Sequence, residues 1–283
     1  MHKKITALLV WIIMMMTMTA KADTTENSTI DPLIKGTPVP MTTSGETSPA
    51  DITKKSIVIL IQKTGDDGTA IAESLQPWIK RWKAEALSSE KVWVLQKNIS
   101  FLLNLCFKVG GREIAPYDIL IRIDLKSDLS DKEKQLLKSL RDMLSSDPNM
   151  HFIMFLTNNS QFIKAPDTRS SDIVMAFINR WHPTLSRQEA LEYWHNQHGP
   201  LVQKIGVPAV VKSYTQIHVD LTADETLFGH DIEGLSFETI SGQNKFILTC
   251  LTNPKLYILN DILLKDELQF TQTSIVFVFK TLR

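Results

Sequence analysis

The sequence predicts an α+β fold built from two tandem βαββαβ units. Short apolar runs typical of buried strands alternate with stretches whose apolar residues recur at helical spacing. This order of elements occurs twice along the 283 residues. The two halves also align without a gap at an offset of 116, which pairs Ile57 with Ile173 and Trp78 with Trp194. Such a register favours an internal duplication.

The first unit is expected over residues 56–168. We predict strands at residues 57–61, 92–95, 117–125 and 151–156 from their apolar or alternating patterns. A first helix is indicated by one apolar face, and Pro77 is expected to kink or restart it; the face consists of Ile71, Leu75, Trp78, Ile79 and Trp82. Ser130 and Glu133 form a capping box that begins the second helix.

The second unit is expected over residues 172–283, with strands at 173–178, 211–219, 234–240 and 275–280. Ser186 and Glu189 again form a capping box, and we expect Gly199-Pro200 to end the helix that follows. Asn253 before Pro254 predicts a last helix through about residue 267. A βαββαβ unit folds as a four-stranded antiparallel sheet with both helices on one face, the ferredoxin-like plan. The two bare sheet faces are then expected to cover each other.

The N-terminal region predicts export. Lys3 and Lys4 precede an apolar run that ends at Ala20-Lys21-Ala22, a pattern typical of a signal peptide over residues 1–22. Residues 23–55 are rich in Thr, Ser and Pro, and we interpret them as a disordered linker. We therefore expect a periplasmic or secreted protein that keeps no stable membrane anchor after cleavage. The 31 basic residues balance 31 acidic ones, so no overall field attracts nucleic acid.

The two cysteines, Cys106 and Cys250, both lie in apolar surroundings. An exported protein could join them in a disulfide, and the same surroundings also suit two inert buried thiols. The spacing of two cysteines fixes no geometry, so both interpretations remain open.

The run from Leu185 to Leu201 resembles the signature helix of the EthD family, through Trp194, His198, Gly199 and Pro200. Arg180, Tyr214 and Asp231 stand where that family has further characteristic residues, and the resemblance spans about residues 173–282. It implies a dimeric α/β-barrel, a group that includes cofactor-free monooxygenases, isomerases and decarboxylases as well as haem-binding proteins. The first half has Trp82 where the second has His198, so it departs from the signature. We expect it to replace the second subunit of a dimer, which makes the chain a monomer with an internal pseudo-dimer.

His198 is the main candidate for chemistry. A histidine can donate or accept a proton near neutral pH, although it can equally fix the end of a helix by a hydrogen bond. We expect it to point into a space between the two sheets, with Tyr214 as a hydrogen-bond donor. The other expected ligand-binding residues are Trp194, His218, Asp231 and Arg180.

Three alternatives concern these side chains. Lys212, Tyr214, Gln216 and His218 share one strand face, which could line a pocket or form a solvent-exposed edge. The tryptophans at 78, 82 and 194 could stack on a ligand or pack in the core. His195 and His198 could share a metal ion, but histidines three apart on a helix are more often a solvated pair, and we predict no metal.

The sequence contains no nucleotide-binding, serine-hydrolase or zinc-type cysteine motif, and we predict no cofactor. The first hypothesis is therefore an exported EthD-like protein that binds a small hydrophobic oxygenated molecule as a cofactor-independent isomerase, decarboxylase or monooxygenase. The second is a non-catalytic exported module that binds haem or another hydrophobic ligand. The third is a structural, partner-binding protein with a filled barrel.

Overall fold

The computed structural model describes residues 51–64, 69–97, 113–114, 117–163, 173–205, 211–229, 232–240 and 254–281. The predicted signal peptide, most of the predicted linker, Cys106, Cys250 and Asp231 lie outside these residues. The described residues belong to one compact unit that spans positions 49–283, so both halves form a single body. None of the described helices is long and apolar enough to cross a membrane.

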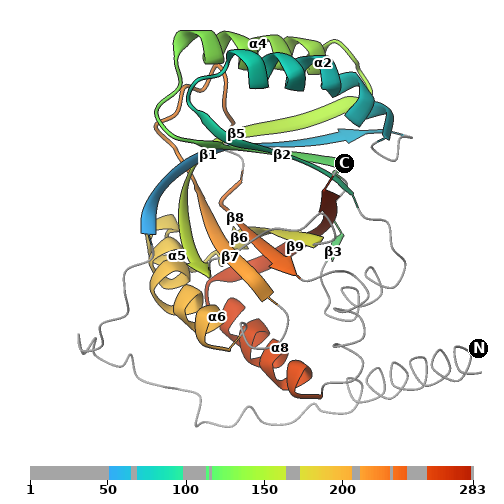
Figure 1. Cartoon of the computed structure of the whole chain (residues 1–283). Coiled ribbons are helices and arrows are strands. Elements are labelled where there is room, and N and C mark those ends of the chain that lie inside the picture. The colour runs from blue at the N-terminus through green and yellow to red at the C-terminus, as the bar shows by residue number, and fades with distance from the viewer. Residues whose placement is uncertain are drawn as a thin grey trace, which may run out of the picture. The chain divides into compact units, whose positions relative to one another are not determined.

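The first half has the predicted βαββαβ order. Its strands pair antiparallel in the order β2-β4-β1-β5, which is the ferredoxin-like arrangement, and both helices lie on one side of the sheet (Figure 1). The elements are β1 (Asp51–Lys63), α2 (Thr69–Glu85), β2 (Ser89–Lys97), β4 (Ile119–Leu125), α4 (Asp131–Ser145) and β5 (Met150–Ile163).

The second half repeats this topology, with the strand order β7-β8-β6-β9. Its first helical stretch consists of three consecutive pieces, which makes it the most irregular helix described. The elements are β6 (Ile173–Trp181), α5 (Arg187–Tyr193), the π-helix η2 (Trp194–His198), α6 (Gly199–Ile205), β7 (Val211–Val219), β8 (Gly234–Ile240), α8 (Pro254–Glu267) and β9 (Thr271–Thr281). A two-residue strand that the sequence did not indicate, β3 (Glu113–Ile114), pairs parallel with β9.

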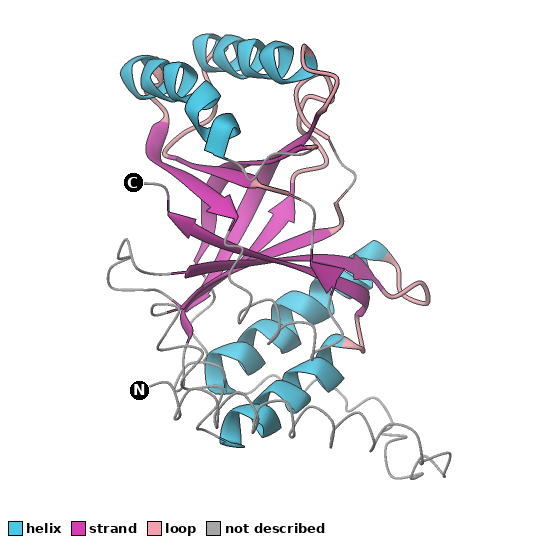
Figure 2. Cartoon of the chain, turned by 90° about the vertical axis from the view of Figure 1, so that its right-hand side faces the viewer, coloured by secondary structure: helices cyan, strands magenta, loops and turns pink. Residues whose placement is uncertain are grey.

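The two sheets join edge to edge and close into one barrel. β5 pairs antiparallel with β7 at one seam, and β2 pairs antiparallel with β9 at the other. The predicted intramolecular dimeric α/β-barrel is therefore confirmed. The inner faces of the two sheets pack against each other as expected, and the sheets are also hydrogen-bonded through their edge strands, which was not predicted. Figures 1 and 2 show the barrel between two helical layers, with α2 and α4 on one side and α5, α6 and α8 on the other.

Alternation of side chains along the strands gives each half two different apolar environments. In β1, the isoleucines at 57, 59 and 61 face α2 and α4, whereas Val58 and Leu60 face the barrel interior. The interior residues of both halves pack into one shared cluster, which includes Phe155, Ala176, Ile217, Leu235, Phe237 and Phe279. The centre of the barrel is thus a common core, which is why the halves form one body.

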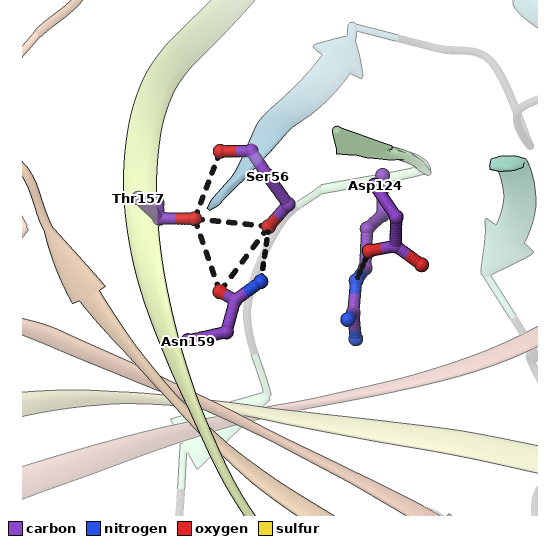
Figure 3. Close-up of polar contacts among 5 residues, drawn as sticks. Ser56, Asp124, Thr157 and Asn159 are labelled. Carbon is purple, nitrogen blue, oxygen red and sulfur yellow. Dashed lines mark hydrogen bonds and ion pairs between the residues drawn. The ribbon is translucent and has the colours of Figure 1, made fainter. Parts of the chain in front are cut away.

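One row of side chains on the inner face of the barrel is polar, and these side chains form hydrogen bonds with one another. The Oγ atoms of Ser56 and Thr157 lie 2.9 Å apart, and Asn159 Nδ2 donates to Ser56 Oγ at 3.1 Å (Figure 3). In the same row Arg122 Nε donates to Asp124 Oδ1 at 2.7 Å. The guanidinium of Arg122 also lies 5.5 Å from the ring centre of Phe237 in the other half. Because these groups bond to one another, we interpret the row as a structural network that fixes strand register.

The segment between β7 and β8 ties the second half to the helical layer of the first. Its Leu227 and Phe228 are buried in the apolar core under α2 and α4. The backbone N–H of Gly229 donates to the carbonyl of Met154 at 2.8 Å, and Arg141 of α4 donates to the carbonyl of Thr226. No sequence pattern indicates this contact, because the segment carries only a short apolar pair.

Two predicted details of the first half are corrected by the structure. β1 begins at Asp51, inside the predicted linker, because the extended strand β5 offers partners that reach Gln161. Helix α2 runs as one element through Pro77, which is exposed. The five residues of its predicted apolar face are all buried, so packing against the sheet outweighs the single hydrogen bond that proline removes.

Candidate functional site

The candidate site lies on the helix-facing side of the second sheet, outside the barrel. Helix α5 begins at the predicted capping box: Glu189 N–H donates to Ser186 Oγ at 3.2 Å, and Ser186 N–H donates to Glu189 Oε2 at 2.8 Å. This start directs Trp194 and His198 toward the sheet, where both are buried.

Between α5 and α6 the helix widens into the π-helix η2. The N–H of Gly199 donates to the carbonyl of Trp194, five residues earlier. The prediction that Gly199-Pro200 ends the helix is wrong, because α6 continues from Gly199 to Ile205 with Gly199 in ordinary helical conformation. Pro200 falls in the first turn of α6, where a missing N–H costs little. Single π turns occur frequently at functional sites.

Two side chains from neighbouring strands hold this π turn. Gln216 of β7 donates its Nε2 to the Trp194 carbonyl at 2.6 Å. The ring of Phe162, from β5 of the first half, covers Gly199 so closely that a Cβ there would lie 2.2 Å from the ring. Gly199 thus leaves room for a ring from the other half, and the first half contributes directly to the site.

His198 is paired with a carboxylate. Its Nδ1 lies 2.7 Å from Asp266 Oδ2 of α8, and Tyr193 Oη donates to the other oxygen of that carboxylate at 2.9 Å. The imidazole centre lies 5.1 Å from the ring centre of Phe270. Burial and the Asp266 carboxylate raise the pKa of Tyr193 above its usual range, so this hydroxyl stays protonated and remains a donor. The position of His198 is thus fixed through Nδ1.

Tyr214 lies beside His198, with ring centres 6.2 Å apart. Its side chain is buried, and Gln216 Nε2 donates to its hydroxyl oxygen at 3.2 Å. Burial raises the pKa of Tyr214 above its usual range, so the hydroxyl keeps its proton and can serve as a hydrogen-bond donor. The burial of Tyr214 and Gln216 also shows that this strand face lies under the helices, which excludes the solvent-exposed edge for these two residues.

Two further histidines lie next to Trp194. His218 of β7 is 5.0 Å from Trp194 and 6.0 Å from His195 between ring centres. Burial lowers the pKa of His218 to about 4, and the nearby charges of His195 and Arg187 act in the same direction. Burial also lowers the pKa of His195, against a hydrogen-bonding contribution from Gln216. Both imidazoles are therefore neutral at neutral pH.

The structure brings most of the predicted site residues together, namely Trp194, His198, Tyr214 and His218. Arg180 is not among them, because it is exposed and lies one residue before Trp181, on the barrel-facing side of β6. The expectation that His198 points between the two sheets is wrong, since it faces α8 instead. Trp78 and Trp82 pack against each other in the core of the first half, with ring centres 5.2 Å apart.

His195 and His198 do not converge on one point. The ring of His195 contacts Phe162 and His218, whereas that of His198 contacts Asp266 and Phe270. Across the described ranges, no group of three or more His, Cys, Asp or Glu side chains could hold a metal ion.

Sequence reasoning missed the residues that support the site. Asp266 stands in the last turn of a correctly predicted helix, where nothing local separates it from a solvated carboxylate. Phe162 lies beyond the predicted end of its strand, at residue 156. Gln216 was visible in the polar strand face, but its role depends on a π turn that no sequence signal indicated.

The sequence matches no protein-family model and no curated protein. Among solved structures, an anthrone oxidase-like protein superposes with a TM-score of 0.55 at 8% identity, covering 82% of this chain and 92% of that one. A proposed monooxygenase from Fusobacterium nucleatum subsp. nucleatum (TM-score 0.49, 6% identity, 81% and 93% covered) is also similar. So is a mutant chlorite dismutase from Candidatus Nitrospira defluvii in complex with cyanide (0.45, 11%, 82% and 92%). The likeness to the anthrone oxidase-like protein, at 8% identity, concerns the fold alone. It agrees with the strand order described above, so the chain has the dimeric α/β-barrel fold.

Proposed function

We propose that this chain is an exported EthD-like protein that binds a small hydrophobic oxygenated molecule beside η2 and uses His198 to transfer a proton. The observation that carries the proposal is the 2.7 Å contact between His198 Nδ1 and Asp266 Oδ2. A carboxylate at one imidazole nitrogen selects the tautomer in which the other nitrogen is a base, and it stabilises the imidazolium that forms.

The surrounding residues suit such a proton transfer. Tyr193 also donates to Asp266, so the carboxylate is held at both oxygens. Tyr214, a protonated phenol beside His198, can donate a hydrogen bond to an enolate-like oxygen that develops as the proton leaves. Trp194 and Phe270 supply apolar walls. This set supports removal of a proton next to a carbonyl, the first step of a cofactor-independent isomerisation, decarboxylation or oxygenation.

Anthrone is a suitable first probe, because an anthrone oxidase-like protein shares the fold and the carbon opposite the anthrone carbonyl carries an acidic hydrogen. Conversion consumes one O₂ and releases one water as anthrone becomes anthraquinone. We expect His198→Gln to lower turnover at least 100-fold and Asp266→Asn at least 10-fold, in line with the usual contribution of a general base. An oxygen electrode and anthraquinone absorbance measure the rate.

His151→Gln is the matched control, because His151 is exposed on β5, in the half without the site. It should leave the rate unchanged. If folded His198→Gln turns over anthrone as fast as the unmodified protein, His198 has no acid–base role. If the unmodified protein shows no turnover, mass spectrometry of co-purifying small molecules provides the next substrates.

A second candidate function is haem binding, and the same carboxylate contact favours it. Histidines that ligate metals commonly donate their other ring N–H to a carboxylate, so His198 would hold the haem iron and Asp266 would orient its imidazole. Titration with hemin decides between the two functions. A Soret shift that His198→Gln abolishes would support haem binding, and an unchanged hemin spectrum would exclude it.

Export is the remaining part of the proposal and depends on the pattern of residues 1–22. Intact-mass measurement of the protein recovered outside the cytoplasm should show a chain that begins at Asp23. A full-length chain retained with the cells would contradict export.

A further inference from the structure

The candidate site contains most of the unsatisfied polar side-chain atoms of the described residues. Across the described residues, six buried side-chain nitrogen or oxygen atoms have no hydrogen-bond partner, and four of them belong to the helix-facing side of the second half. These four are Trp181 Nε1, Trp194 Nε1, Gln216 Oε1 and His218 Nε2. An unmet buried polar group costs about 1–3 kcal/mol, so native structures supply such groups with water or a ligand.

The side chains that carry these atoms form one continuous cluster. The ring centres of Trp181 and Trp194 lie 5.4 Å apart, and those of Trp194 and His218 lie 5.0 Å apart. Gln216 joins them through its bond to the Trp194 carbonyl. Gly234 makes room for the two indoles, since a Cβ there would lie 2.4 Å from Trp181 and 3.3 Å from Trp194.

The chemical roles of the atoms are defined. An indole Nε1 can only donate. The amide of Gln216 uses Nε2 for the Trp194 carbonyl and the Tyr214 hydroxyl, so Oε1 is its remaining acceptor, near His195 but without a hydrogen bond of good geometry. His218 Nε2 can take either role as a neutral imidazole. The cluster therefore matches a group that both accepts and donates a hydrogen bond.

The charges around the cluster favour an uncharged ligand. His195 and His218 are neutral at neutral pH, and Tyr214 keeps its proton. The carboxylates that act on this region are Glu238 and Glu267, both near Tyr214, and Asp266 at His198. The guanidinium of Arg187 helps to lower the pKa of His218, and this side chain is partly exposed. A buried anion would lose its hydration, whereas a neutral group would not carry that cost.

We propose that Trp194, Gln216 and His218 recognise a neutral hydroxyl group of the phenol or enol type on the ligand. The hydroxyl oxygen accepts from Trp194 Nε1, and the hydroxyl proton is donated to Gln216 Oε1 or His218 Nε2. This inference rests on the proposed function, because it names the substrate class of the same site.

Three probes of one size test the inference: 1-naphthol, naphthalene and 1-naphthoate, each measured by equilibrium dialysis at pH 7.5. We expect 1-naphthol to bind at least 10-fold more tightly than naphthalene, and more tightly than 1-naphthoate. Trp194→Phe keeps an aromatic ring but removes the donor, and it should reduce the naphthol preference below threefold.

Trp82→Phe is the control, since Trp82 is equally buried with an unpaired Nε1 but lies in the apolar core of the first half. It should keep the preference. If Trp194→Phe does not fold, His218→Phe takes its place with the same expected loss. Equal affinity for naphthol and naphthalene would overturn the inference, because the unpaired atoms would then hold water only, while the proposed apolar site would stand. Binding of none of the three probes would remove the proposed ligand site and the inference with it.

Discussion

The two halves of the barrel share one topology and differ in what they place between sheet and helices. Trp78 and Trp194 occupy equivalent positions at the offset of 116. Trp78 Nε1 donates to the Leu136 carbonyl at 2.8 Å and lies in an otherwise apolar cluster. Trp194 Nε1 makes no hydrogen bond of good geometry to a described residue, although it lies close enough to the Tyr214 hydroxyl to lower the pKa of that group. Histidine, tyrosine and glutamine surround the Trp194 ring, where Trp78 has an apolar cluster. A duplicated scaffold can therefore use one copy for packing and the other for a polar site.

A second pair of equivalent positions, Trp82 and His198, shows the same contrast. Trp82 of the first half fills the core, whereas the equivalent His198 is paired with Asp266. Phe162, from the first half, covers Gly199 of the second. The first half thus supports the site of the second without offering a corresponding site among its described residues. The two copies are similar in backbone and unequal in chemistry.

The largest expected effect on the free energy of unfolding comes from the titration of His218. Its pKa is lowered to about 4 in the folded chain, against about 6.5 for an exposed histidine. Between these values the unfolded chain binds more protons, so stability falls as pH decreases from about 6.5 to 4, by roughly 3 kcal/mol in total. Urea unfolding at pH 7 and pH 4 measures the loss. His218→Gln should lose about 3 kcal/mol less than the unmodified protein over this interval, and an identical loss would show that His218 is not buried as described.

A smaller effect on the free energy of unfolding is expected from replacing Trp78 or Trp194, and it compares the two halves directly. Trp78→Phe removes a satisfied hydrogen bond together with packing, and we expect it to cost about 2 kcal/mol of unfolding free energy. Trp194→Phe removes packing and an unsatisfied donor, so it should cost about 1 kcal/mol or less. Urea unfolding of the ligand-free variants compares them. The reverse order of the two costs would contradict the contrast drawn between the halves.

The smallest expected effect on stability comes from replacing Gly199 or Gly234 in the second half. Gly234→Ala would push a methyl group against two buried indoles, at a cost of about 1–2 kcal/mol. Gly199→Ala meets only the partly exposed ring of Phe162, which can move, so we expect less than half that cost. Thermal unfolding gives both values. A larger loss for Gly199→Ala would mean that Phe162 is fixed more firmly than Trp181.

Local patterns were sufficient for most of the fold. Both capping boxes and the start of α8 at Pro254 follow from a few neighbouring residues, and the structure has them as predicted. The repeat and the ferredoxin-like order also follow from apolar periodicity. No local pattern predicts the edge-to-edge seams, because β5–β7 and β2–β9 pairing depends on how two complete sheets meet.

The site was only partly predictable for the same reason. The resemblance in residues 185–201 identified Trp194 and His198, but the partner of His198 is 68 positions away, at Asp266. Arg180 was assigned to the site from its place beside the signature, although alternation along β6 puts it on the opposite face from Trp181. The π turn arises from contacts with Gln216 and Phe162, on two strands that no helix pattern can reveal.

Closure of the barrel within a single polypeptide has a consequence for how the protein tolerates dilution. A barrel made from two separate chains exists only above the concentration at which they associate, and its seams dissolve below it. Here β5–β7 and β2–β9 pair inside one chain, so the tether sets a constant effective concentration for both seams. The barrel is then as complete at nanomolar as at micromolar concentration, and each copy is free to change without having to match itself across a symmetry axis.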